Sequence, residues 1–183
     1  MTSIILSSPH LLLRPIKKSD LSDMHKLSSI PEVEKFNTLG IPANISVTKS
    51  ILKDRIKDNK KEPFQNYTFA IEEKRTGKFI GMFGLFLGRP KQQRAEVWYK
   101  FHPDFWGKGL ATESVHCVLD YCFDEMKLHR VEAGCAVENL ASVRVLEKVG
   151  MTREGMARKI LPLDSGWSDG YSFGILSSDE RKR

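Results

Sequence analysis

A strand, a glycine-rich turn and a long helix follow one another between residues 95 and 126, and this succession constrains the fold more than any other part of the chain. Residues 95–101 alternate apolar and polar side chains, which predicts a strand with one buried face. From Leu110 to Met126, apolar residues recur at the spacing of one helix face. Because Gly107 and Gly109 lie between the two patterns, we expect the strand to turn tightly into the helix.

The segments before this region indicate further strands and helices. Residues 67–71 alternate and residues 79–87 are rich in strand formers, which predicts a hairpin. The strand at 95–101 then follows as a third antiparallel neighbour. Nearer the start, the predicted elements are a strand at Leu11–Arg14, a helix capped by Ser19-Asp20 and extending to Leu27, and a charged helix at Ser46–Lys60.

After the long helix, the sequence predicts a second strand and helix and then a closing pair of strands. Residues 131–137 alternate as a strand, and apolar residues from Val143 to Val149 predict a short helix that ends at Gly150. The order strand, helix, strand, helix is that of a βαβα unit. The closing strands are predicted at 151–158 and 171–176, with a turn-rich stretch at Asp164–Gly170 between them.

Length and composition fit one folded domain. The chain has 183 residues, of which 40% are hydrophobic and 28% charged, so it can bury a core without a disulfide or a metal. No linker or internal repeat divides it, and residues 1–183 are predicted to form a single domain. The start, Met1 to Ser8, lacks the pattern of a secretory signal, and no apolar run is long enough to span a bilayer. We therefore expect a cytoplasmic protein with no membrane partner.

The cysteines and the net charge exclude some classes of protein. Cys117, Cys122 and Cys135 are odd in number and show no C-x-x-C spacing, so neither a disulfide framework nor a zinc site is predicted. The net charge of 29 − 23 = +6 suits a protein that meets phosphates, acidic proteins or nucleic acid. Nucleic-acid binding is supported by charge alone and is therefore disfavoured.

Gly107 and Gly109 fit two interpretations: a loop that binds a ligand, or a turn of the chain without a ligand. Without side chains they let backbone N–H groups approach an anion, and the positive end of a helix favours a phosphate there. The alternative is a plain strand-to-helix turn. The spacing fits neither the nucleoside triphosphate loop G-x-x-x-x-G-K-[ST], because Lys108 lies between the glycines, nor the dinucleotide pattern G-x-G-x-x-G, because Thr112 holds its last position.

The stretch Trp106-Gly107-Lys108-Gly109-Leu110-Ala111-Thr112 resembles the acyl-CoA pyrophosphate loop of the GNAT acetyltransferase superfamily. That loop has Gln or Arg, two residues, Gly, one residue, then Gly or Ala, and Gly109 and Ala111 match its small positions. Trp106 at the first position is typical of the ribosomal-protein N-acetyltransferase branch. The other matching segments are Leu12–Pro15, Ile80-Gly81, Pro103–Gly109, Asn139–Ser142 and Leu146–Gly150, so the resemblance covers nearly the whole chain.

The resemblance implies an α/β (α+β) fold, a mixed, mostly antiparallel sheet flanked by helices whose splayed central strands bind acetyl-CoA. It implies that backbone groups of Lys100, Phe101 and His102 contact the pantetheine arm. N–H groups from Trp106 to Thr112 would hold the pyrophosphate. Acetyl-CoA is then the co-substrate, and no metal is expected.

Four more side chains are candidates next to the cofactor. Lys108 and Lys148 could face phosphate charge, although surface lysines are commonly only solvated. Asn139 could bond pantetheine, or it could cap the helix that follows it. Ser142 resembles the family position near the thioester sulfur, whereas a serine at a helix start carries no such meaning by itself.

The chemistry of amine acetylation asks for a base, because an α-amino group has a pKa near 8 and must lose a proton to attack a thioester. Glu96 shares a strand face with Trp98 and Lys100 and matches a family position that often holds a glutamate base, acting directly or through water. Its structural alternative is a cross-strand ion pair. The family tyrosine that protonates the thiolate is replaced by Leu146, so Ser142 or water would supply that proton.

The resemblance thus implies an N-acetyltransferase whose acceptor is the N-terminal amine of a ribosomal or other protein. The alternatives are a small amine, such as a polyamine or an aminoglycoside, and a non-catalytic acyl-CoA-binding sensor. The segments Pro31–Asn44 and Leu161–Asp169 are expected to border the acceptor site. The sequence leaves the acceptor open, and it leaves open whether the protein is a monomer or a homodimer.

Overall fold

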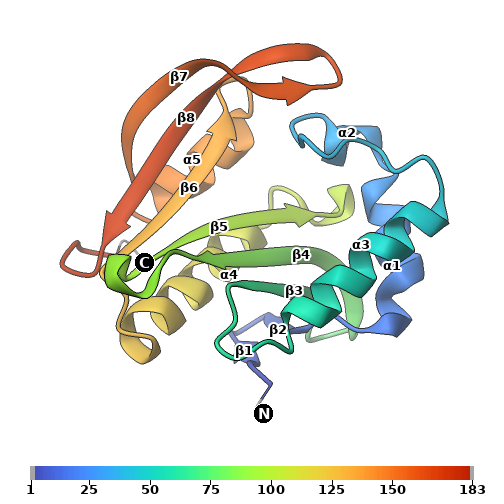
Figure 1. Cartoon of the computed structure of the whole chain (residues 1–183), viewed down its shortest axis with the longest axis horizontal. Helices are drawn as coiled ribbons and strands as arrows, with labels where there is room; N and C mark the ends of the chain where they lie inside the picture. Colours follow the sequence, from blue (N-terminus) through green and yellow to red (C-terminus); the bar gives the residue numbers. More distant parts are fainter. Residues whose placement is uncertain (1–2, 182–183) are drawn as a thin grey trace.

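The computed structural model describes residues 3–181 and contains one eight-stranded sheet in the order β1-β2-β3-β4-β5-β6-β8-β7 (Figure 1). The strands are β1 (Leu6–Ser7), β2 (Leu11–Pro15), β3 (Asn66–Glu73), β4 (Lys78–Leu87), β5 (Arg94–Phe101), β6 (Arg130–Ala136), β7 (Thr152–Leu163) and β8 (Gly166–Leu176). The α-helices are α1 (Leu21–Ser28), α2 (Pro31–Glu34), α3 (Ile45–Asp58), α4 (Leu110–Asp120) and α5 (Leu140–Lys148).

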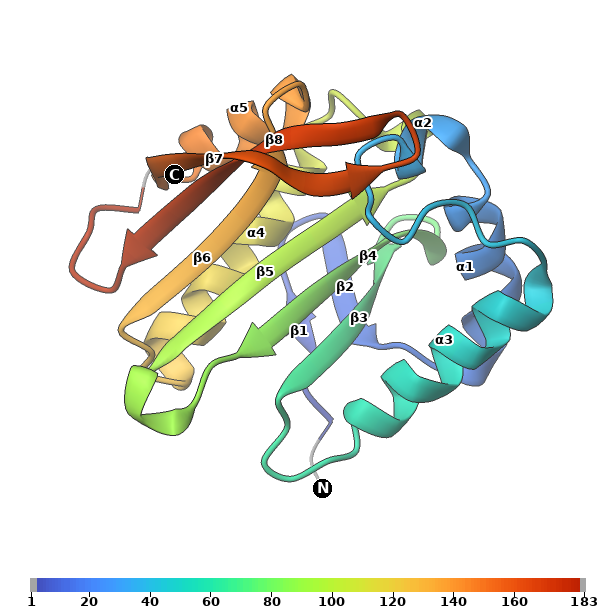
Figure 2. The ribbon, with the colours of Figure 1, turned by 45° about the horizontal axis from the view of Figure 1, so that its top comes forward.

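Helices cover both faces of the sheet and give it two separate cores (Figure 2). On one face, α4 and α5 bury the larger apolar cluster, which includes Val97, Phe101 and Val118. On the other face, α1 and α3 bury a smaller cluster around Leu52 and Met82. The alternation along β5 divides its side chains between these cores, as strand geometry requires.

The centre of the sheet opens where its only described parallel pair of strands separates. β5 and β6 pair in parallel from Arg94↔Arg130 to Val97↔Ala133, whereas the other neighbouring strands are antiparallel. Beyond Val97 the two ribbons spread apart in both views (Figures 1 and 2). The predicted mixed, mostly antiparallel sheet with splayed central strands is therefore confirmed.

The structure differs from the sequence prediction at several ends and turns. The long helix changes at Tyr121 into one π-helical turn, Tyr121–Glu125. The closing strands β7 and β8 extend almost to their connection at 164–165, although residues 164–170 were predicted to be a turn. The short helix α2 and the strand β1 were not predicted, because four and two residues are too few to show a period.

Asp20 occupies the N-cap position of α1, as predicted, but its side chain bonds elsewhere. Its side chain makes no cap bond to α1; instead, both carboxylate oxygens accept hydrogen bonds from Arg14, each at 2.8 Å, and one also accepts from the N–H of Lys17. Both side chains are largely buried, at 13% and 5% exposure, so each charge needs the other there. Among residues 3–181, no helix is long and apolar enough to cross a membrane.

Candidate active site

The edge of β5 that faces the opening carries backbone groups that β6 no longer pairs. The N–H groups of Gly88 and His102 donate to the carbonyls of Arg94 and Ile80, which fixes the phase of the β4–β5 ladder. Along a strand, the backbone N–H and C=O groups of successive residues point to opposite sides. Those of Lys100 therefore face β4, and those of Tyr99 and Phe101 face the opening. The His102 carbonyl also accepts from Phe105.

This phase corrects the expected backbone contacts. The groups available to a ligand in the opening belong to Tyr99 and Phe101, whereas those of Lys100 and His102 already serve the chain. The Phe101 carbonyl accepts a 2.8 Å hydrogen bond from Trp106 Nε1, so its N–H is the freer of its two groups. Through this hydrogen bond the Trp106 indole, which is 49% exposed, holds the end of β5 in place.

The glycine turn after β5 has the backbone that an anion site needs. Gly107 and Gly109 adopt φ values of +70° and +77°, in the left-handed region that side chains disfavour. Gly109 is the N-cap of α4 and contributes no side-chain cap bond. Because the first residues of a helix have no intrahelical acceptor for their N–H groups, Leu110, Ala111 and Thr112 can donate outward. The N–H of Trp106, in contrast, already donates to Pro103.

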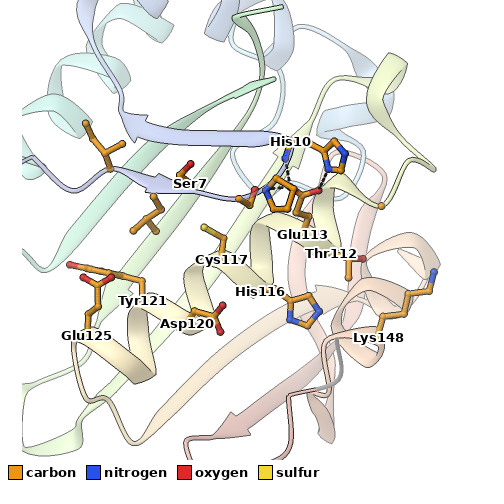
Figure 3. A pocket seen from close by; sticks show the side chains of 15 residues that line it. Ser7, His10, Thr112, Glu113, His116, Cys117, Asp120, Tyr121, Glu125 and Lys148 are labelled. Carbon is orange, nitrogen blue, oxygen red and sulfur yellow. Dashed lines mark hydrogen bonds and ion pairs between the residues drawn. The ribbon is translucent and has the colours of Figure 1, made fainter. Parts of the chain in front are cut away.

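A pocket of about 750 Å³ adjoins this turn and runs along α4 (Figure 3). Figure 3 shows Thr112 and Lys148 at one end of it and Tyr121 and Glu125 at the other. The structure therefore brings Lys148 of α5 to the glycine turn. Lys108 lies 5.2 Å from the centre of the Phe105 ring instead, in a cation–π contact.

Two hydroxyl groups meet across the opening. Tyr99 Oη from β5 lies 3.0 Å from Ser142 Oγ in the first turn of α5. The side chain of Asn139 accepts a 3.2 Å hydrogen bond from the N–H of Ser142, which confirms its capping role. Leu146, in the position of the family tyrosine, is 1% exposed and packs in the core. The tyrosine hydroxyl in this region therefore comes from Tyr99 of β5 and not from the α5 position that Leu146 occupies.

The opposite face of β5 carries buried charge. Lys100 Nζ forms an ion pair with Glu34 of α2 and donates a 2.9 Å hydrogen bond to Ser28. The Lys100 and Glu34 side chains are 11% and 2% exposed, and Glu34 Oε2 has no hydrogen-bond partner among the described residues. Burial lowers the pKa of Lys100, although Glu34 partly opposes this effect. This charge cluster fixes α2 against the sheet.

Arg55 of α3 and Trp98 extend the same face. The Arg55 guanidinium lies 4.7 Å from the centre of the Trp98 ring, and burial lowers its pKa to about 10. The indole lies across β4 at Gly84, where an added Cβ would come within 1.9 Å of Trp98 Nε1. Glycine at this position therefore leaves the space that the indole fills.

Glu96 is exposed on this face and lies in register with Phe86 of β4 and Glu132 of β6. It belongs to the paired part of the two central strands, one residue before Val97, where pairing ends. The cross-strand ion pair at this end is made by Arg94 and Glu132, with Nη1 and Oε2 at 2.6 Å. Among residues 3–181, Glu96 forms no ion pair, and its exposed carboxylate is accessible to a substrate.

The two segments expected to border the acceptor contact each other. A Cβ added at Gly40 would lie 3.1 Å from Asp164 Oδ1, so the loop before α3 touches the β7–β8 connection. Figure 2 shows this connection passing beside α2 and the loop that follows it.

His102, at the end of β5, accepts a 3.3 Å hydrogen bond from the N–H of Asp104 and so stabilises the turn after the strand.

Sequence reasoning missed three residues of this region. Tyr99 was assigned only to the apolar face of its strand, yet a tyrosine among buried residues usually needs a partner for its hydroxyl, and this was the available signal. Glu34 lies in the four-residue helix α2, which shows no period, so its pairing with Lys100 was not predicted. Arg55 reaches Trp98 through tertiary packing, for which the sequence offers no pattern.

The chain matches the family described as acetyltransferase (GNAT) domain over residues 10–152, and it belongs to that family. A Bacillus subtilis protein, Probable N-acetyltransferase YjcK, is 40% identical over 122 residues, 66% of this chain and 67% of its own. A second, Uncharacterized N-acetyltransferase YnaD, is 30% identical over 95% of this chain and 98% of its own. The crystal structure of a Bacillus anthracis GNAT acetyltransferase has a TM-score of 0.84 and 28% identity, covering 96% and 100% of the two chains.

Two further relatives carry names that mention an acceptor. YdaF of Bacillus subtilis, provisionally named a ribosomal N-acetyltransferase, is 31% identical over 56% of each chain. The spermidine N(1)-acetyltransferase of Vibrio cholerae is 26% identical over 92% of this chain and 94% of its own. The chain is accordingly an N-acetyltransferase of a family that uses acetyl-CoA.

Proposed function

We propose that this enzyme acetylates the N-terminal amine of a protein, ribosomal or other, within a single domain formed by residues 1–183. The observation that carries the proposal is the apolar character of the two segments beside the opening. Leu39 and Ile41 on one segment are 67% and 45% exposed, and Ile160 and Trp167 on the other are 55% and 61% exposed. A peptide that continues from the reacting amine has apolar groups to bury there, whereas a polyamine has mainly charge.

The charges on the acceptor side agree with this choice. The carboxylate of Glu34 is already neutralised by Lys100, and Arg55 adds a second buried cation. Lys100, Glu34 and Arg55 together carry a net positive charge, so like-charge repulsion disfavours a substrate with several ammonium groups. The name of the YdaF relative points the same way, and the spermidine-acetylating relative supplies the competing acceptor for the test.

In the proposed mechanism, the glycine turn and α4 hold the donor. N–H groups from Gly107 to Thr112 donate to the pyrophosphate at the positive end of α4, and Lys148 adds a charge nearby. The backbone of Tyr99 and Phe101 offers strand-like hydrogen bonds to the amides of the pantetheine arm. Asn139 acts here only indirectly, because its side chain caps α5.

Glu96 accepts the proton of the attacking amine, directly or through one water. An α-amino group has a pKa near 8, so at neutral pH most of it is protonated and a carboxylate can collect the proton. The neutral amine nitrogen then forms a bond to the acetyl carbon while the carbon–sulfur bond breaks and its electron pair stays on sulfur. The nitrogen releases its second proton to solvent as the amide forms. Ser142 donates a hydrogen bond to the thiolate sulfur, which takes one proton from solvent and leaves as the CoA thiol.

The test is CoA release from acetyl-CoA with peptides that begin with Ser, Ala or Asp, compared with spermidine and an aminoglycoside. We expect peptide turnover at a kcat/KM at least about tenfold above either small amine, a difference of about 1.4 kcal/mol. Glu96→Gln should lower peptide kcat about 100-fold with little change in the KM for acetyl-CoA. Preferential turnover of a small amine would replace the proposed acceptor, and a fully active Glu96→Gln would remove the proposed base.

A further inference from the structure

A pair of hydroxyls links β5 and α5 beside the opening, and a phenylalanine at position 99 would keep the ring but lose this contact. The Tyr99 ring stacks on Phe83, with centroids 5.9 Å apart and planes inclined by 27°, and its hydroxyl leaves this stack to reach Ser142 Oγ at 3.0 Å. We propose that Tyr99 is a positioning residue: its hydroxyl donates to Ser142 Oγ and thereby directs the Ser142 proton toward the thioester sulfur. This inference rests on the proposed role of Ser142.

Tyr99 is suited to be the donor of the pair. It is partly buried and packs against the larger core, and desolvation raises the pKa of its phenol well above the usual value. The phenol therefore keeps its proton throughout the neutral and mildly alkaline range. The pairing with Ser142 and the stacking on Phe83 hold that proton in one direction.

The other contacts of Ser142 complete the argument. A serine hydroxyl has one proton to donate and two sites that accept. With Tyr99 as the donor of the pair, its hydroxyl fills one accepting site of Ser142 Oγ. The single Ser142 proton is then not used in this pair and is left for a further partner.

The backbone of Ser142 is fixed as well. Asn139 accepts from its N–H, which holds the first turn of α5, and with it the Cα of Ser142, in place beside Tyr99. Leu146 supplies no hydroxyl to the opening. When the amine bonds to the acetyl carbon, the electron pair of the broken carbon–sulfur bond resides on sulfur, and the Ser142 proton is the one aligned to meet it. Tyr99 itself gives up no proton in the net reaction.

A binding experiment tests this without an acceptor. Calorimetry at pH 9, where a thiol of pKa near 8.5 is mostly ionised, compares CoA with desulfo-CoA, which lacks the sulfur. We expect the wild type to bind CoA about tenfold more tightly than desulfo-CoA, because a hydrogen bond to a charged group is among the stronger ones. Tyr99→Phe and Ser142→Ala should each reduce this ratio to about threefold or less, and the double variant should not reduce it further.

A kinetic experiment adds a second readout and a matched control. Tyr99→Phe should lower kcat about tenfold with an unchanged KM for acetyl-CoA, and it should have no further effect in a Ser142→Ala background. Tyr67→Phe is the control, because Tyr67 is buried, packs against Phe69 and uses its hydroxyl, which accepts from the N–H of Ile4. It should leave both the kinetics and the CoA to desulfo-CoA ratio unchanged.

The outcomes separate this inference from the proposed function. If Ser142→Ala lowers the sulfur preference and Tyr99→Phe does not, Tyr99 has no positioning role and the inference is overturned, while Ser142 keeps its place. If the two variants reduce kcat additively, they act independently, which also overturns it. If the wild type turns peptides over but binds desulfo-CoA as tightly as CoA, the hydroxyl pair is overturned although N-acetylation stands.

Discussion

Both faces of β5 carry polar groups near the centre of the sheet, but the groups on the two faces differ in kind. Toward α4 and α5, the polar groups are neutral: backbone N–H groups, the hydroxyls of Tyr99 and Ser142, and helix caps. Toward α1 and α3, they are the charges of Lys100 and Glu34, buried and paired. Burying neutral groups costs less free energy than burying charges. The stability of the face toward α4 and α5, here called the donor face, should therefore depend on geometry. The stability of the face toward α1 and α3, here called the acceptor face, should depend on the balance of its charges.

The largest effect is expected when the charge balance of the acceptor face is broken. Lys100→Met leaves the Glu34 carboxylate buried without its cation, which should lower the free energy of unfolding by about 3–5 kcal/mol. Exchanging both residues in Lys100→Met, Glu34→Met removes the charges together and should restore most of that stability. Chemical denaturation of the two variants measures both changes.

An exposed ion pair is the control for this prediction. Lys61 and Asp58 lie 2.5 Å apart with the Lys61 side chain 54% exposed, so Lys61→Met should cost less than about 1 kcal/mol. If Lys100→Met costs no more than Lys61→Met, the contrast between the two faces of β5 does not hold.

On the donor face, the next effect is geometric. Gly109→Ala forces a side chain into a left-handed conformation, which should cost about 1–2 kcal/mol, and it should also raise the KM for acetyl-CoA about tenfold because the turn shifts. Gly77→Ala is the matched control: Gly77 has φ +66°, and, like Gly109, an added Cβ there meets nothing within 4 Å. It should cost similar stability without changing the KM. Equal KM values for the two variants would detach the turn from donor binding.

The helix caps give a smaller and equally paired effect. Asn139→Ala and Asn44→Ala each remove an N-cap, of α5 and of α3, and each should cost about 1 kcal/mol of stability. Only Asn139→Ala should also reduce kcat, since its cap holds the turn that carries Ser142. Thermal unfolding and steady-state kinetics together show whether the two effects separate, and a loss of kcat in Asn44→Ala would contradict the distinction.

The same contrast explains what the sequence could and could not predict. Alternation along residues 95–101 predicted the strand and divided its side chains between two faces, because burial on one side imposes a period of two. The glycine turn and the Asn139 cap were also predictable, since backbone needs are local. The partner of Lys100 was not, because it comes from a four-residue helix without a period. The partner of the Asp20 side chain was not predicted for a related reason: that partner, Arg14, lies on β2.

The smallest effect concerns Glu113, a carboxylate of α4 that is hydrogen-bonded to the N-terminal segment. Glu113 Oε1 accepts from Ser8 Oγ at 2.7 Å and from the N–H of His10 at 2.8 Å, and Oε2 lies 2.9 Å from His10 Nδ1 (Figure 3). Burial raises the pKa of Glu113, but these hydrogen bonds lower it by more, so the folded-state pKa lies below the ordinary value.

The pKa of Glu113 is lower in the folded than in the unfolded chain, so the unfolded chain binds more protons at pH values between the two. The contribution of this carboxylate to stability is therefore fully present above an unfolded pKa near 4.3. It is lost as the pH falls through the folded pKa. Glu113→Gln should therefore be less stable than the wild type by below about 1 kcal/mol at pH 7, with the gap closing as the pH falls to about 3. Urea denaturation from pH 7 to pH 3 measures the gap, and Ser8→Ala should show a smaller version of the same trend. A gap that stays constant with pH would mean that Glu113 contributes through packing alone, and its negative charge would then add nothing to the link between the N-terminal strands and α4.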